Sequence, residues 1–398
     1  MIAKEKAAAA SLAESSGSSD GGVGVDDLAA ARLSNVDVFR AVAVLMVVLY
    51  HFGWLPYGYL GVDLFFVISG LLVSRLLIRD FRARRPIHYL RFVVARGFKI
   101  WPSYYALLAI GSAFAYLAYH NSHPDQVIRL AHLPRYLFFV LNYRATDHWS
   151  FDHLWSLCVE EHFYLLLPLV FLVAERCFAS SPRVLMALVA LLIPAGIVAK
   201  QLGYLIHYET LAATHNRIDA LAWGVLLALL DEFAPRFMAT WQRPRWFAGS
   251  LFAGVAILAG SIALAASGRS PWWNAVAFHA FVPVSCFLLL GATLHVDMSR
   301  QRVLRFVAAR SYNWYLWHVP LVMFFRDYLG PGPLGLVVYL TVSFGLAMRF
   351  TRSIERPFVL LRRRALDRLL PRRDEPVALG ARAVTVAAGP FASNRAAS

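Results

Sequence analysis

Apolar runs of membrane-spanning length recur along most of the chain. A helix needs roughly 20 apolar residues to cross the ~30 Å hydrocarbon layer of a bilayer, and within that layer a helix satisfies its own backbone hydrogen bonds. Runs of this length lie at residues 37–55, 60–78, 98–118, 154–174, 184–203, 216–231, 247–266, 275–294, 309–326 and 333–352. The sequence therefore predicts an all-α polytopic membrane helix bundle with about ten transmembrane helices.

The composition agrees with a membrane protein. Hydrophobic residues make up 59% of the chain and charged residues 16%, which is far from the balance of soluble domains. A net charge of +15 could indicate a nucleic-acid partner, but the arginines stand between the apolar runs rather than in one basic domain. We therefore expect the lipid bilayer as a partner and no nucleic acid.

The arginines also predict which side each loop faces. The segment 75–99 holds eight Lys or Arg residues, whereas 53–59 holds none. Because cytoplasmic loops are rich in Lys and Arg, we expect both termini to be cytoplasmic and the loop at 119–153 to lie outside. A membrane domain is expected at 34–360. Residues 1–33 and 361–398 lack long apolar runs and are predicted to be a disordered cytosolic leader and a basic disordered tail.

Two ionisable residues on the first apolar run are the first candidates for a functional site. Arg40 and His51 are eleven residues apart, so a helix places them on one face with ~16 Å of rise between them. Ionisable groups within a membrane span are costly and usually functional. The structural alternative is a snorkelling arginine and a packed core histidine.

Two further clusters follow. Arg96 and Lys99, three residues apart, share a helix face and could clamp a phosphate group. The alternative is that they are ordinary basic residues at the cytoplasmic end of a membrane span. In HLWSLCVEEHFYLLLP, at 153–168, His153 and Glu160 are seven residues apart and are predicted to line one stripe, while Glu161 points elsewhere. The alternative for this cluster is a buried polar network that holds helices together.

Seven segments form an ordered series of motifs between residues 34 and 360: NVDVFRAVAVLMVVLYHF, YLGVDLFFVISGLLVSRLL, RGFKIWPSYY, HLWSLCVEEHFYLLLPL, NRIDALAWGVLLALL, SYNWYLWHVPL and SIERPF. This series resembles the motifs of the acyltransferase-3 family of bacterial integral-membrane O-acyltransferases. The family modifies glycans and some secondary metabolites. The resemblance therefore implies an enzyme that transfers an acyl group to a hydroxyl.

The resemblance also implies roles for individual residues. His51 matches the family's essential histidine, and Arg40 matches the arginine paired with it. Arg96 and Lys99 match an Arg-x-x-Arg motif thought to hold the phosphates of acyl-CoA. Lysine in place of the second arginine replaces a bidentate fork with a point charge. Glu160 is shared with the family, and His162 replaces its usual glutamine.

The remaining candidates carry less specific signals. Asp63 lies in GVDLFF, which we interpret mainly as helix packing through Gly61 and Gly70. Asp219 is expected either to pair with Arg217 or to face the cavity. His318, two turns after Ser311, either lines the same cavity or is a hydrogen-bonded core histidine. Glu355 belongs to the SIERPF motif. The three cysteines have no metal-ligand spacing, and no metal site is predicted.

We expect a multi-pass O-acyltransferase of the bacterial inner membrane with no permanently bound cofactor. Cytosolic acyl-CoA, most simply acetyl-CoA, would be the donor, and a glycan or lipid-linked glycan on the outer side would be the acceptor. His51 would act as a general base or carry the acyl group transiently, with Glu160 and His153 assisting it. A small metabolite such as a macrolide is an alternative acceptor. A transporter that uses the same ionisable residues is an alternative of another class.

Overall fold

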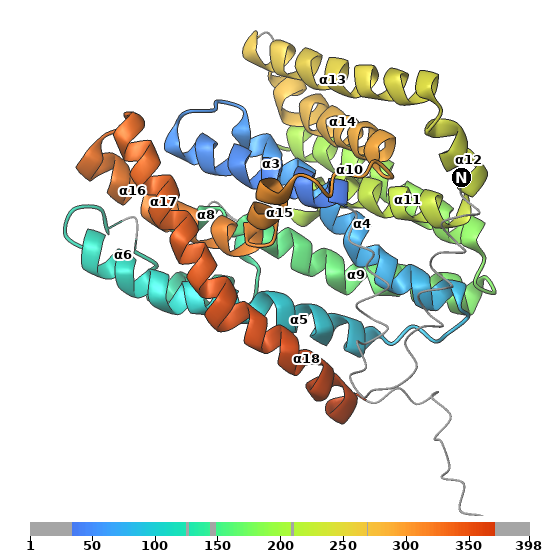
Figure 1. Ribbon diagram of the computed structural model, residues 1–398, viewed down its shortest axis with the longest axis horizontal. Coiled ribbons are helices and arrows are strands. Elements are labelled where there is room, and N and C mark those ends of the chain that lie inside the picture. The colour runs from blue at the N-terminus through green and yellow to red at the C-terminus, as the bar shows by residue number, and fades with distance from the viewer. Residues whose placement is uncertain (1–33, 125–126, 144–148, 208–210, 269, 371–398) are drawn as a thin grey trace, which may run out of the picture.

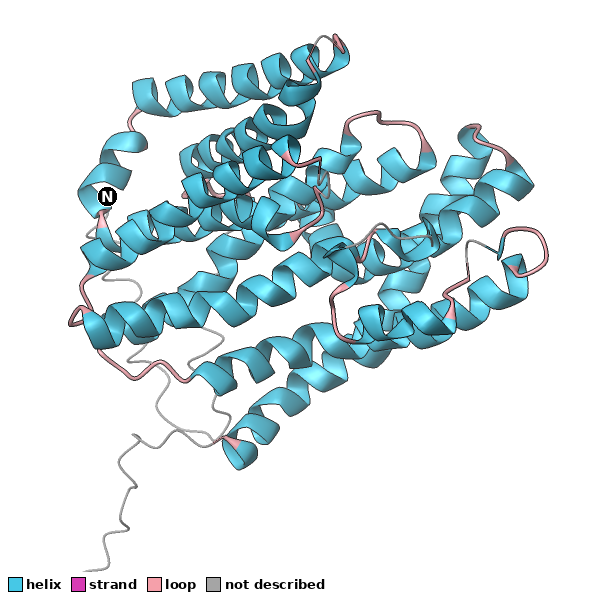
Figure 2. Cartoon of the chain, turned by 180° about the vertical axis from the view of Figure 1, so that it is seen from behind, coloured by secondary structure: helices cyan, strands magenta, loops and turns pink. Residues whose placement is uncertain are grey.

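The computed structural model describes residues 34–124, 127–143, 149–207, 211–268 and 270–370. Over these residues it is a bundle of helices without strands (Figure 2). The α-helices are α3 (Ser34–Phe52), α4 (Gly61–Arg82), α5 (Tyr89–Ala106), α6 (Ser112–Tyr119), α7 (Leu133–Leu137), α8 (Trp149–Asp152), α9 (Trp155–Cys177), α10 (Pro182–Leu205), α11 (Ile218–Phe233), α12 (Pro235–Trp241), α13 (Pro244–Ala266), α14 (Phe278–Thr293), α15 (Arg302–Ala308), α16 (Ser311–Leu329), α17 (Pro333–Phe350) and α18 (Arg356–Leu369).

Three of the long helices continue through short π-helical turns. These are η2 (Leu107–Gly111), η7 (Trp273–Ala277) and η8 (Thr351–Glu355). Short 3-10 turns make up the rest: η1 (Gly58–Leu60), η4 (Leu130–His132), η5 (Leu141–Tyr143) and η6 (Thr214–Asn216). A π turn inserts an extra residue and shifts the helix face, a feature often found at functional sites.

The structure confirms a membrane bundle but differs from the sequence in the number of spans. A helix occupies each of the ten apolar runs, yet within the described ranges only eight are long and apolar enough to cross a membrane. The exceptions are α11, which has 16 residues, and α16. Both are largely buried among other helices, so neither needs an apolar surface against lipid.

Glycines bring the central helices into backbone contact. A Cβ on Gly70 of α4 would lie 2.0 Å from the carbonyl oxygen of Leu221, and one on Gly224 of α11 would lie 1.9 Å from that of Val67. Only glycine allows this approach, a common way for membrane helices to pack. A Cβ on Gly61 would lie 2.4 Å from the carbonyl oxygen of Ala43 in α3. The packing predicted for Gly61 and Gly70 is therefore confirmed.

The loops gather at two opposite ends of the bundle (Figure 1). At one end Arg84 donates to the carbonyl oxygen of Ala179 at 2.7 Å, which joins the α4–α5 and α9–α10 loops. At the other end Trp54 Nε1 donates to the carbonyl oxygen of Pro331 at 2.9 Å and joins the loops after α3 and α16. We call these the basic end and the aromatic end.

The helical part of the chain extends beyond the membrane domain expected from the sequence. The disordered tail was expected from 361 onward, but α18 continues to Leu369. Its residues are strongly amphipathic and rich in arginine, which favours a helix lying along a surface. The leader at 1–33 and the tail beyond residue 370 lie outside the described residues.

Site-directed labelling tests the predicted orientation. In a Cys177→Ser background, which removes the exposed native thiol, Ala83→Cys at the basic end should react with an impermeant maleimide only after the membrane is opened. Ser122→Cys, in the opposite loop, should react in intact cells, because the basic end is expected to be cytoplasmic. Equal labelling of both positions in intact cells would contradict this orientation.

Candidate active site

Arg40 and His51, which the sequence placed on one helix face, both lie on α3 and contact α16. Arg40 donates from Nη2 to Ser311 Oγ at 3.0 Å. His51, in the last turn of α3, lies with Nδ1 3.2 Å from Nε2 of His318. Ser311 and His318 are seven residues apart on α16, so both contacts fall on the same side of that helix. Arg40 and His51 therefore lie on the same face of α3, as predicted, and this face packs against α16.

The hydrogen bonds of the two histidines define their tautomers. His318 Nδ1 lies 2.6 Å from the carbonyl oxygen of Tyr315, so this nitrogen carries a hydrogen and Nε2 is an acceptor. His51 Nδ1 lies 2.9 Å from the carbonyl oxygen of Val47 and therefore also carries a hydrogen. Neutral His51 then has its lone pair on Nε2, which is the nitrogen that can accept a proton.

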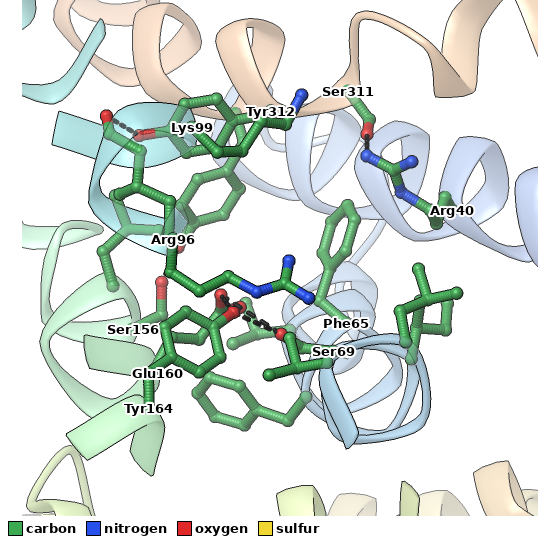
Figure 3. Close-up of a pocket in the computed structure, with 18 residues that line it drawn as sticks. Arg40, Phe65, Ser69, Arg96, Lys99, Ser156, Glu160, Tyr164, Ser311 and Tyr312 are labelled. Atoms are coloured by element: carbon green, nitrogen blue, oxygen red, sulfur yellow. Dashed lines mark hydrogen bonds between the residues drawn. The ribbon is translucent and has the colours of Figure 1, made fainter. Parts of the chain in front are cut away.

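A cavity of about 190 Å³ lies between α3, α4, α5, α9 and α16 and carries three cations. We call it the basic cavity. Its polar and charged lining residues are Arg40, Ser69, Arg96, Lys99, Ser156, Glu160, Tyr164, Ser311, Tyr312 and Tyr315. Figure 3 shows the guanidinium of Arg96 reaching across the cavity toward Ser69, while Arg40 turns toward Ser311. Arg40, Arg96 and Lys99 come from two helices, and all three line one space.

Glu160 is held on the wall of this cavity by two hydroxyl groups. Tyr164 donates to Glu160 Oε2 at 2.5 Å, and Ser69 Oγ lies 3.3 Å from the same oxygen and 2.6 Å from the Tyr164 hydroxyl. Arg96 lies over the Tyr164 ring with its Cζ 5.9 Å from the ring centroid. The two hydroxyl groups therefore fix the Glu160 carboxyl group on the cavity wall, next to the ring over which Arg96 lies.

Lys99 has a partner that its position in the sequence did not reveal. Its ammonium pairs with Glu355 Oε1. Asn313 Nδ2 donates to Glu355 Oε2 at 2.6 Å and to Thr351 Oγ1 at 2.9 Å. The π turn η8 begins at Thr351 and ends at Glu355, and both residues are buried. This turn therefore places the carboxylate of Glu355, the glutamate of the SIERPF motif, next to the Lys99 ammonium.

Tyr315 stands between the basic cavity and the histidine pair. It lines the cavity, and its ring centroid is 5.5 Å from that of His318. Its hydroxyl donates to the carbonyl oxygen of His153 at 2.8 Å and lies 2.5 Å from Ser156 Oγ. His51 is not among the lining residues, so the cavity ends at Tyr315, which precedes His318 by less than one turn of α16.

Comparison with known proteins decides the family. A family model described as an acyltransferase domain, that of the acyltransferase-3 family, matches residues 33–352. The chain belongs to the acyltransferase-3 family. The O-acetyltransferase OatA of Staphylococcus aureus (strain NCTC 8325 / PS 47) is 28% identical over 335 residues, covering 77% of this chain and 53% of OatA.

A putative O-acetyltransferase of Staphylococcus aureus (strain COL) is 29% identical over 364 residues, covering 82% of this chain and 57% of that protein. The chain thus spans about half the length of the curated acyltransferase-3 relatives it matches. No solved structure matches it.

The structure separates two residues that the sequence grouped together. His153 and Glu160 were expected on one helix stripe, but α9 begins only at Trp155, and His153 lies in the turn before it. Its Nε2 donates to the carbonyl oxygen of Leu316 at 3.0 Å, and its ring centroid is 5.3 Å from that of His318. His153 therefore belongs with the histidine pair, and Glu160 belongs with the basic cavity.

Asp219 and Asp63 form a second buried group away from the cavity. Asp219 was expected to pair with Arg217 or to face the cavity, and neither is correct, because it accepts from Lys200 Nζ at 2.5 Å. Arg217 instead pairs with Asp63 at 3.1 Å and lies 2.9 Å from His279 Nδ1. Glu161 points away from the cavity, as predicted, and accepts from Trp101 Nε1 at 3.2 Å.

Several residues of the site were not predicted. Tyr164 follows Glu160 by four residues, so helical periodicity could have paired them. Asn313 and Tyr315 lie on the same helix as Ser311 and His318, within the SYNWYLWH motif, and the unusual number of polar residues in that span was the available signal. Lys200 and His279 lie on other helices, and no local pattern connects them with their partners.

Proposed function

We propose that this protein transfers an acetyl or other short acyl group from cytosolic acyl-CoA to a hydroxyl on the outer side of the bacterial inner membrane. One observation carries the proposal: Arg40, Arg96 and Lys99 converge on a single cavity, and the helix pair that supplies Arg40 also holds the His51–His318 contact. Three cations around one space suit the pyrophosphate of CoA. The names of the relatives, O-acetyltransferases, agree with acetyl transfer.

The chemical step uses the basic nitrogen of His51. Nε2 removes the proton from the acceptor hydroxyl as its oxygen attacks the thioester carbonyl. The carbon–sulfur bond then breaks, the acyl group remains on the acceptor as an ester, and the thiolate of CoA takes the proton from His51. His318 holds the His51 ring through Nδ1, as a second residue often does for a catalytic base.

Access to His51 requires Tyr315 to move. Arg40 and His51 are separated by ~16 Å along α3, a distance that the extended pantetheine arm of CoA can bridge from a pyrophosphate near Arg40. The Tyr315 side chain lies between the cavity and His318. We infer that donor binding turns this side chain away and breaks the contacts of its hydroxyl with Ser156 and with the carbonyl oxygen of His153.

The aromatic end next to His51 supports a glycan acceptor. Tyr50 is 38% exposed and Trp54 47% exposed, and the Tyr50 and His51 ring centroids are 5.0 Å apart. Exposed aromatic rings offer flat apolar faces on which the carbon–hydrogen face of a sugar can stack. A sugar hydroxyl placed there would approach His51 from the side opposite the basic cavity.

The proposal is tested by comparing O-acyl groups on surface glycans from cells with and without the gene. Purified protein in nanodiscs, given labelled acetyl-CoA and isolated glycan, should transfer the label. We expect the ester to disappear in the deletion strain and to return with the plasmid-borne gene. Unchanged O-acylation in the deletion strain, with no transfer in nanodiscs, would contradict the proposed function.

Lys99 offers a narrower test, because it serves both the cavity and Glu355. Lys99→Gln should weaken acyl-CoA binding by about 1–3 kcal/mol, the range for a charge-assisted hydrogen bond, and should lower thermal stability by leaving the Glu355 carboxylate buried without its cation. Lys99→Arg should retain binding. Calorimetric titration with acetyl-CoA and a melting curve for each variant measure the two effects.

A double variant separates the two effects of Lys99. Lys99→Gln with Glu355→Gln removes both charges, so stability should recover while donor binding stays weak. Binding should also weaken as salt rises, because the phosphates and their cations are partly screened. Wild-type affinity of Lys99→Gln at low salt would exclude Lys99 from the donor site.

A further inference from the structure

A second cavity lies between α4 and α5, nearer the basic end. It has a volume of about 130 Å³ and is closed on its third side by α18. Its charged lining residues are Arg79, Asp80, His88, Arg91 and Arg362. We call it the α18 cavity. Three arginines against one carboxylate make it a candidate site for an anion.

The two cavities are lined by successive turns of the same helices. On α4, Leu72 and Val73 line the basic cavity, and Leu76 and Leu77 line the α18 cavity. On α5, Arg96 lines the first and Ala95 the second. One helical turn, about 5–6 Å, separates the two levels. An elongated ligand that follows α4 and α5 would therefore reach both cavities.

Arg362 of α18 is the cation best placed for such a ligand. Within the described ranges it makes no ion pair or hydrogen bond, whereas Arg91 donates to Asp367 and to the carbonyl oxygens of Leu366 and Leu370 and so fixes α18 in place. Arg96 lines the basic cavity and Arg362 lines the α18 cavity, so each cavity has a guanidinium group from a different helix. An anionic ligand that reaches from one cavity to the other could contact both groups.

We propose that the α18 cavity holds the 3′-phosphorylated adenosine end of the CoA donor, with Arg362 contacting the 3′-phosphate. The inference rests on the proposed function, because it completes the path of the same donor. The pyrophosphate would then lie at the basic cavity beside Arg96, one turn away, a separation that the ribose of a nucleotide spans. Phe92, which also lines the α18 cavity, offers an apolar wall for the adenine base. We choose a nucleotide over a lipid headgroup as the occupant because Ala95 of the α18 cavity is adjacent in sequence to Arg96 of the proposed donor site.

The test compares acetyl-CoA with 3′-dephospho-acetyl-CoA, which differs only in the proposed ligand group. Binding to the full-length protein in nanodiscs of neutral lipid is measured by calorimetry for wild type and Arg362→Gln. Wild type should prefer acetyl-CoA by about 10-fold or more, as expected for a charged hydrogen bond of at least about 1.5 kcal/mol. In Arg362→Gln the preference should fall below about 2-fold, because acetyl-CoA binds more weakly while the dephospho donor binds as before.

Two control variants accompany this measurement. Arg364→Gln removes a charge from the exposed face of the same helix and should keep the full preference. Arg362→Lys keeps the charge and should retain most of the preference, which gives a result even if the glutamine variant is poorly folded. A gel-filtration profile and a melting temperature for each variant confirm the fold.

The possible failures are distinguishable. If wild type binds both donors equally, or if Arg362→Gln weakens both by the same factor, the inference is wrong while the proposed function stands. If anionic lipid stabilises wild type but not Arg362→Gln, and the donor preference is unchanged, the cavity holds a lipid headgroup and the inference is again wrong. If wild type binds neither donor, the proposed function itself fails.

Discussion

His51→Ala is expected to reduce acyl transfer at least about 100-fold while leaving the protein in the membrane. A positioned general base typically contributes 10²–10⁴-fold to a rate, and alanine has no group that can accept the proton. The fold should survive, because His51 lies in the last turn of α3 and its hydrogen bonds are to the carbonyl oxygen of Val47 and to His318. Transfer of labelled acetyl groups in nanodiscs, at matched protein amounts, measures the effect.

Another half-buried histidine provides the matched control for this variant. His162 contacts Thr214 Oγ1 at 2.6 Å and lies outside the basic cavity. His162→Gln, which introduces the residue usual in the family, should retain nearly full activity. Donor affinity should stay near the wild-type value in His51→Ala, since the proposed phosphate contacts lie ~16 Å away along α3. Near-normal transfer by His51→Ala would exclude His51 as the base.

The sequence predicted what helical periodicity determines. Helical periodicity, at about 100° per residue, predicts the shared face of Arg40 and His51 and the different directions of Glu160 and Glu161. The structure agrees with both. Periodicity failed for His153 because that residue precedes the first turn of α9. Helical periodicity gives the wrong side-chain direction for a residue that lies beyond the end of the helix.

Contacts between helices could not be predicted in the same way. Lys99 and Glu355 are 256 residues apart in the chain, and Lys200 and Asp219 belong to different helices. Such pairs depend on which helices are neighbours, and one sequence carries no information on that. Hydropathy likewise predicted ten equivalent spans, but α16 carries several polar residues, and residues 311–325 of this helix are buried or half-buried. These polar residues pack against other helices, which a scale for transfer into lipid does not take into account.

The buried group around Arg217 is expected to carry much of the stability of the bundle. Arg217 and Asp63 have side chains that are 5% and 0% exposed, and their N–O distance is 3.1 Å. Removing one partner of a buried pair leaves an uncompensated charge and costs about 3–5 kcal/mol. Arg217→Gln should therefore lower the melting temperature sharply, as measured by gel filtration of heated detergent extracts.

The double variant Asp63→Asn with Arg217→Gln decides whether this loss comes from the unpaired charge. With both charges removed, the pair leaves no uncompensated charge buried, and the two amides can hydrogen-bond to each other. We therefore expect the double variant to be more stable than Arg217→Gln alone, and the exposed-site control Arg300→Gln to match wild type. If the double variant melts as low as the single one, Arg217 acts through its packing over the Trp155 ring, where Cζ lies 5.3 Å from the centroid, and the ion pair contributes little.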